Sequence, residues 1–391
     1  MKEETKIVVA GRHPEDNFGI VNAPVYHAST VLYPSLAELQ KTHAARAAGE
    51  RVVSYGRIGT PTTWSLEDAV AELEGGYRAQ VFPSGLAAVS HAMLAFLKSG
   101  DHLLMTDSVY GPSRIFCDNV LSRFGIEVTY YDPLIGAGIA DLIRPETRLV
   151  YVEAPGSQTF EMQDIPAIAD VAHARDARVM MDNTWASPLF FKPFDHGVDI
   201  SIQAGTKYIV GHSDVMLGIV TTTKDCWPVL QKGANMMGQT AGPDDVYLAQ
   251  RGMRTLSVRL KQHMVNAIAV AEWLKGRPEV HSVLHPALPD DPGHAIWKRD
   301  FTGSSGLFSM RLKEVSKDAI AAFLDDLELF GMGYSWGGYE SLIILADPTS
   351  YRTATTWDNT NPLLRLHIGL EAVEDLIADL EAGFNRLNAA K

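Results

Sequence analysis

Two reactive side chains stand where predicted strands end. Asp182 closes the apolar run RVMMD, and Lys207 follows the run ISIQAGT. Ligands of open α/β sheets bind beyond the carboxyl ends of the strands, so a carboxylate and an amine at this edge could act together on a bound molecule. On position alone, an ion pair between them is the favoured interpretation, because this is the commonest fate of such residues.

Two further features shift this balance toward a bound phosphate and a planar ring. The run FPSGLAAV predicts that Ser84 and Gly85 begin a helix, where free backbone N–H groups and the positive end of the helix dipole bind phosphate. The simpler alternative is a serine N-cap followed by a glycine. Tyr110 follows the turn TDSVYG, from which its ring could cover a flat ligand. The alternative for Tyr110 is an aromatic side chain at the rim of the site.

These groups together fit pyridoxal 5'-phosphate (PLP). Lys207 would bond covalently to the aldehyde of PLP. Asp182 would keep the pyridine nitrogen protonated, so that the ring accepts electrons, and Tyr110 would stack on the face of the ring. The sequence therefore predicts a PLP site at the strand ends.

The elements that must position these side chains follow from the hydrophobic pattern. Between residues 80 and 220, short β-rich runs alternate with stretches whose apolar residues recur at helical spacing. This pattern predicts an α/β fold, with a mostly parallel sheet flanked by helices on both faces. We expect strands at residues 102–107, 126–132, 148–155, 177–184 and 199–207, and helices at residues 84–100, 111–124 and 165–176.

The pattern changes after about residue 250, and a smaller C-terminal α+β domain is expected there. It is predicted to comprise helices at residues 245–276, 316–330 and 372–387, and strands at 306–312, 341–346 and 363–370.

The chain is therefore divided into three parts: an N-terminal arm (1–60), a large domain (61–250) and the smaller domain (251–391). The arm carries Val25, Tyr26, Leu32 and other apolar residues, which favours packing on a neighbouring subunit over a free tail.

Composition excludes several classes of partner. Acidic residues outnumber basic ones by 47 to 34, a net charge of −13, so neither nucleic acid nor a membrane surface is an expected partner. No apolar run approaches the roughly 20 residues of a membrane helix, and the N-terminus lacks a secretory signal, so a cytoplasmic location is expected. Two cysteines exclude a disulfide framework.

Familiar catalytic motifs of other enzyme classes are missing. The run GAGIAD lacks the third glycine of a dinucleotide loop, and GHSDV lacks the last glycine of a nucleophile elbow. Neither a P-loop nor the zinc motif H-E-x-x-H occurs, and the thirteen histidines form no obvious metal-ligand pairs, so no metal site is expected. Hydride transfer, phosphoryl transfer, serine hydrolysis and zinc catalysis are therefore all disfavoured.

Several longer motifs resemble one known family. The runs VSYGRIGTPT, FPSGLAAV, DNTWASP and SIQAGTKYIVGHSD are similar, in this order, to motifs of the cystathionine γ-synthase-like (Cys/Met metabolism) family of fold-type-I PLP enzymes. The resemblance extends from about residue 5 to 388. Within that family, YSWGGYESL and LLRLHIGLE are similar to the bacterial cystathionine β-lyases.

The resemblance implies roles for residues that the pattern alone does not explain. Arg365, otherwise read as a surface charge at a strand end, would bind the α-carboxylate of a small sulfur amino acid, which suits a forked guanidinium. Ser335 and Trp336 would position the lysine and that carboxylate. Tyr55 and Arg57 would reach the cofactor phosphate of the neighbouring subunit, which implies a catalytic dimer and commonly a tetramer.

The phosphate site also shows departures from the family pattern. Thr206 would add a hydroxyl to the phosphate, and Leu86 would contribute through its backbone N–H, although related enzymes often carry methionine or alanine there. Ala204 stands where many members have a phosphate-binding serine. Residues 351–361 match no motif, so a substrate-contacting loop could differ there.

The activity implied is cleavage of L-cystathionine to homocysteine, pyruvate and ammonia. Lys207 would take the α-proton, and a part for Tyr110 in deprotonating the incoming amine is left open. The alternatives are a γ-lyase, an O-acyl-homoserine sulfhydrylase or a desulfhydrase of cysteine and its S-conjugates. A PLP-binding protein without turnover is disfavoured, because Lys207, Asp182 and Arg365 are all in place.

Overall fold

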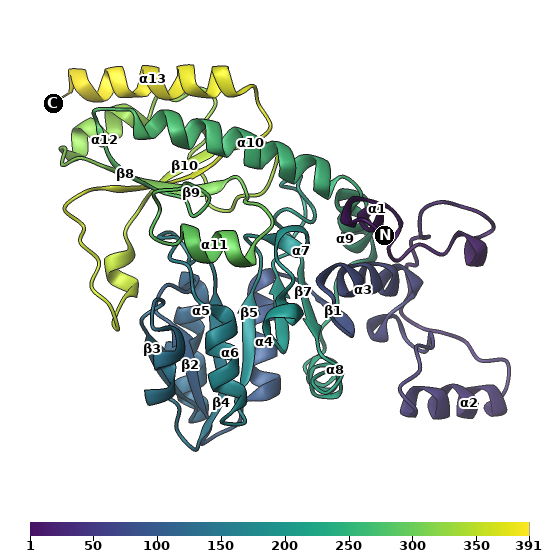
Figure 1. Cartoon of the computed structure of the whole chain (residues 1–391). Coiled ribbons are helices and arrows are strands. Elements are labelled where there is room, and N and C mark those ends of the chain that lie inside the picture. The colour runs from purple at the N-terminus through teal and green to yellow at the C-terminus, as the bar shows by residue number, and fades with distance from the viewer. Residues whose placement is uncertain (391) are drawn as a thin grey trace.

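The computed structural model describes residues 1–390 and contains two sheets (Figure 1). The larger sheet has seven strands in the order β1-β7-β6-β5-β4-β2-β3. All neighbouring pairs from β6 to β3 are parallel, and only β7 runs against its two neighbours. The strands are β1 (Arg78–Phe82), β2 (His102–Thr106), β3 (Glu127–Tyr131), β4 (Thr147–Glu153), β5 (Arg178–Asp182), β6 (Ile200–Gln203) and β7 (Gly218–Thr222).

Helices cover both faces of this sheet, because its central strands are apolar on both sides. In β4, Leu149 and Tyr151 pack under one set of helices, whereas Val150 and Val152 pack under the other set. The first set comprises α4 (Gly85–Phe96), α5 (Gly111–Phe116) and α8 (Trp227–Met236), and the second comprises α3 (Pro61–Glu74), α6 (Ile165–His173), α7 (Ser187–Phe190) and α9 (Pro243–Met253).

The smaller sheet is antiparallel, with four strands in the order β10-β11-β9-β8. Helices α10, α12 and α13 lie over its outer face, away from the large sheet (Figure 1). The elements are α10 (Leu256–Lys275), β8 (Val280–Leu284), α11 (His294–Asp300), β9 (Leu307–Leu312), α12 (Lys317–Leu324), β10 (Leu342–Ala346), β11 (Leu363–His367) and α13 (Val373–Ala389).

The predicted fold class is confirmed, and three details differ from expectation. Strands β1, β7 and β8, of five residues each, were not predicted. The helix expected at 245–276 is two helices, and the chain turns between them at Arg254 and Thr255. Strand β6 ends at Gln203, so Lys207 lies in the loop beyond it. The division at residue 250 falls within α9 and stays a prediction.

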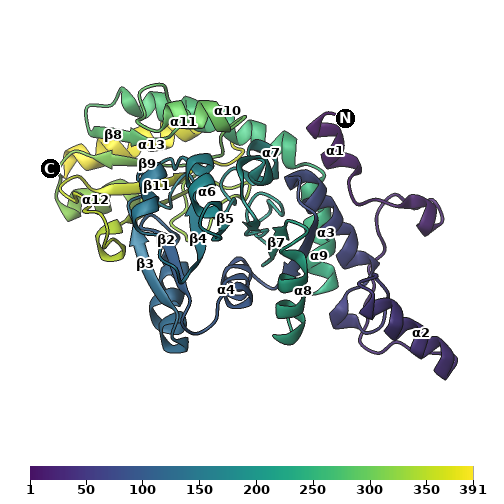
Figure 2. The ribbon, with the colours of Figure 1, turned by 60° about the horizontal axis from the view of Figure 1, so that its bottom comes forward.

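The N-terminal segment divides into a docked part and a projecting part. Helix α1 (Glu3–Val9) packs on the body, with Ile7 buried and Arg254 donating to the carbonyls of Ile7 and Ala10. Helix α2 (Leu36–Ala47) has no buried residue and stands away from the body (Figure 2). The first ten residues therefore pack on their own chain, and the expected arm of residues 1–60 stays a prediction.

One glycine in the large sheet sets how closely a helix approaches it. A Cβ atom on Gly218 of β7 would lie 2.1 Å from the carbonyl oxygen of Ser84, the residue that precedes α4. Because the φ angle of Gly218 is not in the left-handed region, this close approach is what requires glycine there. The start of α4 therefore rests directly on the strand.

We predict that Gly218→Ala lowers the free energy of unfolding by about 1–3 kcal/mol, because α4 must move away from β7. The melting temperature at equal protein concentration measures the effect. Gly276→Ala is the matched control, since a Cβ there meets its nearest atom at 3.4 Å in a right-handed helical conformation, and it should shift stability by less than about 1 kcal/mol. Equal melting temperatures for the two variants would contradict the close approach.

Candidate active site

Strand ends of the large sheet bring two carboxyl groups together. Glu153 and Asp182 are register partners at the ends of β4 and β5. The Asp182 carboxylate accepts a hydrogen bond from the Thr184 backbone N–H at 3.0 Å. Burial raises the pKa of Asp182, while the Thr184 hydrogen bonds and the positive charge of Lys207 oppose this rise. The structure thus brings Asp182 and Lys207 within electrostatic range of each other, as predicted.

The Lys207 amine lies between the two domains. Its Nζ is 2.5 Å from Oγ of Ser335 and 5.3 Å from the centre of the Trp336 ring. Burial and, to a smaller extent, the charge of Arg365 together lower the pKa of Lys207 to about 8, while the charge of Asp182 opposes the change. The amine is therefore partly neutral near neutral pH, which a nucleophile or base requires.

A tight turn of the small domain packs on Lys207. Ser335 and Gly337 adopt positive φ angles of 80° and 90°. A Cβ atom on Gly337 would lie 2.9 Å from Cα and the carbonyl carbon of Lys207, so only glycine fits against the lysine backbone. The Gly337 N–H also donates to Nε2 of His367 at 3.1 Å. This contact fixes the turn, and with it the Ser335 hydroxyl, over the lysine.

Arg365 occupies the middle of β11, paired with Ile344 of β10 and Ser309 of β9. This is not the position of a strand-end surface charge. Its guanidinium donates to the Ser335 carbonyl at 3.1 Å, and burial lowers its pKa to about 10. Arg365, Ser335 and Lys207 thus form a continuous chain of contacts from the small domain to the large one.

The start of α4 has the geometry expected for a phosphate. Ser84 is the N-cap, with its hydroxyl accepting from the Ala87 N–H at 3.1 Å. The first intrahelical bond runs from Ala88 to the Ser84 carbonyl, which leaves the N–H groups of Gly85 and Leu86 without an intrahelical acceptor. A Cβ on Gly85 would lie 2.7 Å from Cβ of Ala204. A narrow cradle with free donors fits a phosphate group, so these residues suit PLP.

The loop after β6 offers fewer hydroxyl groups than the resemblance implies. The Thr206 hydroxyl accepts from the Leu217 N–H at 2.8 Å and donates to the Leu217 carbonyl at 3.2 Å. Its single proton would have to leave that carbonyl to reach a phosphate. Ala204 has no hydroxyl, and its N–H donates to Oγ1 of Thr184. The phosphate role of Thr206 stays a prediction.

Tyr110 lies at the edge of the same site. It is the N-cap residue of α5 and is 43% exposed. Its backbone N–H donates to Oε2 of Glu153 at 2.8 Å. Burial raises the pKa of the phenol, as do the negative charges of Asp182 and Glu153, while Arg365 opposes them. The ring is thus within electrostatic range of both the predicted aspartate and the predicted arginine.

Sequence reasoning missed Glu153, although it carried the same signal as Asp182. Both carboxylates end an apolar strand, and burial raises the pKa of Glu153 well above its ordinary value, with the nearby Asp182 charge adding to the rise. Inspection of every strand end would have found it.

Tyr55 and Arg57 lie outside this cluster within residues 1–390. Tyr55 is the N-cap of the short helix η2 (Gly56–Ile58), and Arg57 lies within it. The Arg57 guanidinium donates to the Asn235 carbonyl of α8 at 3.0 Å. Tyr55 is 45% exposed. The chain therefore does not bring these two residues to its own Lys207.

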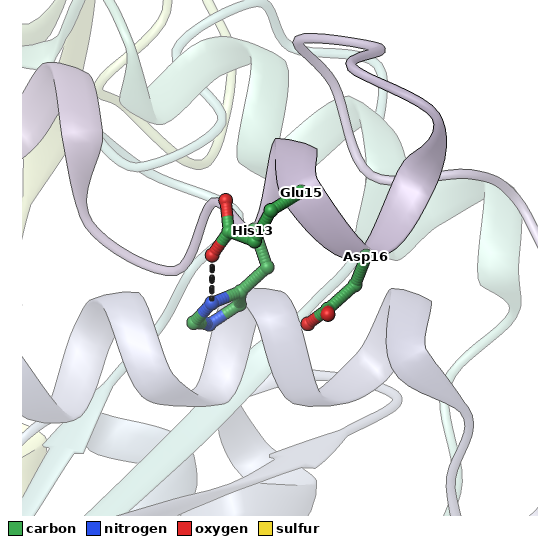
Figure 3. Close-up of side chains that lie close together, drawn as sticks. All are labelled: His13, Glu15 and Asp16. Carbon is green, nitrogen blue, oxygen red and sulfur yellow. Dashed lines mark ion pairs between the residues drawn. The ribbon is translucent and has the colours of Figure 1, made fainter.

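One group of possible metal ligands occurs in the described part of the chain. Nδ1 of His13 lies 3.6 Å from Oε1 of Glu15, and Asp16 is close by (Figure 3). The sequence pattern had indicated no such group. All three side chains are exposed, and exposed acidic groups are common without an ion, so we assign no metal to this group.

No helix within residues 1–390 combines the length and apolar character needed to cross a membrane.

Comparisons with known proteins agree with this geometry. The family of Cys/Met metabolism PLP-dependent enzymes matches residues 4–385. The chain is 48% identical over 392 residues to the cystathionine beta-lyase of Escherichia coli K12, covering 99% of each protein. It is also 48% identical over 390 residues to that of Salmonella typhimurium, covering 98% of each.

A solved structure shows the same fold. The cystathionine gamma synthase of Xanthomonas oryzae aligns with a TM-score of 0.89 and 33% identity, over the whole of both chains. The strand-end cluster, the cradle at the start of α4 and these full-length matches lead to one assignment: the chain belongs to the family of Cys/Met metabolism PLP-dependent enzymes, and its cofactor is PLP.

Proposed function

We propose that this protein cleaves the Cβ–S bond of L-cystathionine, giving homocysteine, pyruvate and ammonia, a step of methionine biosynthesis. The observation that carries the proposal is the connection of Lys207, Ser335 and Arg365 across the two domains. It places a base beside a group that can hold an amino-acid carboxylate. The full-length similarity to proteins named cystathionine beta-lyase supports the choice of substrate.

Arg365 and Tyr110 would orient the substrate between the domains. The Arg365 guanidinium would bind the α-carboxylate with two parallel hydrogen bonds. Tyr110 would cover one face of the cofactor, held there by the bond from its backbone to Glu153. Because Arg365 and Lys207 both contact Ser335, a substrate bound in this way would lie beside the Lys207 amine.

PLP, when bound, takes up the electron pair that is released when Cα loses its proton. Lys207, in its neutral form, accepts that proton, and Ser335 fixes the direction of the amine. Asp182 provides the negative charge that keeps the ring nitrogen protonated. The overall reaction would break the Cβ–S bond with departure of the thiolate, and the remaining three-carbon fragment would hydrolyse to pyruvate and ammonia.

We also propose that each site is completed by a second copy of this chain. The support is the projecting helix α2, which buries none of its own residues, and the nearby Leu32, which is 88% exposed. Tyr55 and Arg57 follow this helix and do not contact their own Lys207. In a dimer they would bind the cofactor phosphate of the neighbouring subunit, and two dimers would form a tetramer.

Product analysis tests the proposed reaction directly. With L-cystathionine, we expect pyruvate and homocysteine in equal amounts, and Lys207→Ala should lose the cofactor absorbance and essentially all cleavage. Production of 2-oxobutyrate and cysteine would instead assign the protein to the γ-lyases. Cleavage of cysteine but not cystathionine would assign it to the desulfhydrases.

The lowered pKa of Lys207 predicts how the cofactor-free protein regains PLP. Only the neutral amine reacts with an aldehyde, and with a pKa of about 8 its neutral fraction rises from about a tenth at pH 7 to about nine tenths at pH 9. The rate of recovery of cofactor absorbance should therefore rise about tenfold over this range and then level off. The same measurement on Nα-acetyl-lysine corrects for the titration of PLP itself. A corrected rate that still climbs beyond pH 10 would show an ordinary lysine.

A mixture of two inactive variants tests the shared site. Lys207→Ala and Arg57→Ala chains, mixed, unfolded and refolded together, should pair at random. Half of the dimers would be mixed, and one of the two sites in each would hold both native residues, so about a quarter of wild-type activity should return. The absence of recovery, with mixed dimers verified by mass spectrometry and Arg57→Ala alone inactive, would show that Arg57 acts within its own chain.

A further inference from the structure

The segment that links β10 to β11 reaches from the small domain to the large one. It begins with the short helix η7 (Pro348–Tyr351) and ends directly before Arg365's strand. In Figure 1 it forms the yellow-green loop that extends from the small sheet toward the side of the large domain with β3. It includes residues 351–361, which matched no family motif.

A single buried carboxylate anchors this segment. Asp107 follows β2, and its side chain is fully buried. The backbone N–H groups of Thr353, Ala354 and Thr355 donate to it at 2.8 to 3.1 Å, and so does the Thr355 hydroxyl at 2.8 Å. These bonds cross the domain boundary and reach both carboxylate oxygens, one at Oδ1 and three at Oδ2.

The anchor adjoins the turn that carries Tyr110. Asp107 precedes Tyr110 by three residues, and Arg114 follows it in α5. The Arg114 guanidinium donates to Asp107 at 2.9 Å and to the Thr353 hydroxyl at 2.5 Å. The Tyr351 ring lies against Gly111, next to Tyr110, since a Cβ there would meet it at 3.4 Å. The segment therefore contacts the Tyr110 turn on both sides of Tyr110, at Asp107 and at Gly111.

A second set of contacts also fixes this segment to the large domain. The buried Arg352 guanidinium donates to Glu161 at 2.6 Å and to Thr159 at 2.5 Å, both in the loop after β4. The segment is thus fixed to the loops after β2 and β4. Strand β4 lies between β2 and β5, which carries Asp182.

We propose that Asp107 is a positioning residue, which sets the distance between Tyr110 and Arg365 by docking residues 353–355 of the small domain onto the Tyr110 turn. Arg365 lies ten residues beyond Thr355 on the same segment and strand. The proposal deepens the function proposed above and rests on it, because Tyr110 and Arg365 must face the same substrate.

The expected kinetic effect follows from the preorganisation of the site. Without the anchor, the domains occupy the competent arrangement only part of the time, and apparent affinity falls by that fraction. Once substrate has bound, the domains of the variant have the same competent arrangement as those of the wild type. Loss of the anchor should therefore raise KM much more than it lowers kcat.

The test compares Asp107→Asn with Asp164→Asn in the PLP-loaded enzyme. The Asp164 carboxylate accepts a hydrogen bond from Arg299 of α11 at 2.8 Å. The control therefore makes the same chemical change at another contact between the domains, one that involves neither Tyr110 nor residues 353–355. Asparagine can still cap α6, as Asp164 does. For L-cystathionine, Asp107→Asn should raise KM about tenfold with kcat changed less than about threefold. The control should change neither.

Hydrogen exchange gives a readout independent of turnover. The amides of Thr353, Ala354 and Thr355 should exchange faster in Asp107→Asn than in the wild type and in the control, with the absorbance of the bound cofactor unchanged. Unchanged exchange, or a fall in kcat at constant KM, would overturn the proposal. If Asp107→Asn does not fold, Thr355→Val removes one donor to Asp107 and should show the same effects at smaller size; wild-type values for it would equally overturn the proposal.

Binding of L-alanine separates this proposal from the proposed reaction. L-alanine has an α-carboxylate but no thiol to expel, and its binding changes the cofactor absorbance. Its Kd should rise about tenfold in Asp107→Asn even if the wild type fails to cleave L-cystathionine. An unchanged Kd would reject the positioning role of Asp107 while leaving the reaction class untouched.

Discussion

Burying an amine costs free energy unless its surroundings favour the neutral form or supply a counter-charge. The Lys207 amine meets both conditions. Trp336 and the turn at Ser335 remove water from it, Arg365 repels its proton, and Asp182 limits the effect. Because these groups come from both domains, the arrangement of the domains is a condition for the chemistry.

The site depends on close contacts that only glycine allows. Gly337 lets the turn of the small domain lie on the lysine backbone, and within the large domain Gly218 lets α4 lie on β7. His367 accepts a hydrogen bond from the Gly337 N–H and so fixes the turn at Ser335. The His367 ring belongs to a cluster of rings that includes Tyr208, Trp336 and His263. The site therefore rests on packed aromatic side chains rather than on long flexible ones.

Sequence reasoning found the parts of this site that follow from local pattern. Periodicity within about ten residues is enough to predict the parallel sheet, the strand end at Asp182, the position of Lys207 after a strand and the helix start at Ser84. The same reasoning misjudged short strands such as β7, which is buried on both faces and shows no alternation.

Contacts between distant residues were beyond that reasoning. Asp107 and Thr353 are 246 residues apart, and no period connects them. Arg365 gained its role only from the family resemblance, because its burial depends on β9 and β10 forming on either side. The surface that Arg57 would contact belongs to a second chain. The sequence pattern of one chain does not show how two chains pack.

Helix α2 has a consequence for the newly made chain. A helix of 12 residues without tertiary contacts is marginal in water, and α2 buries none of its side chains within its own chain. Its apolar neighbours, Leu32 and Tyr26 among them, are exposed as well. A newly synthesised chain would thus expose an apolar, aggregation-prone segment until it pairs with another copy. The yield of native protein would depend on the relative rates of assembly and aggregation, and hence on how fast the chain is synthesised.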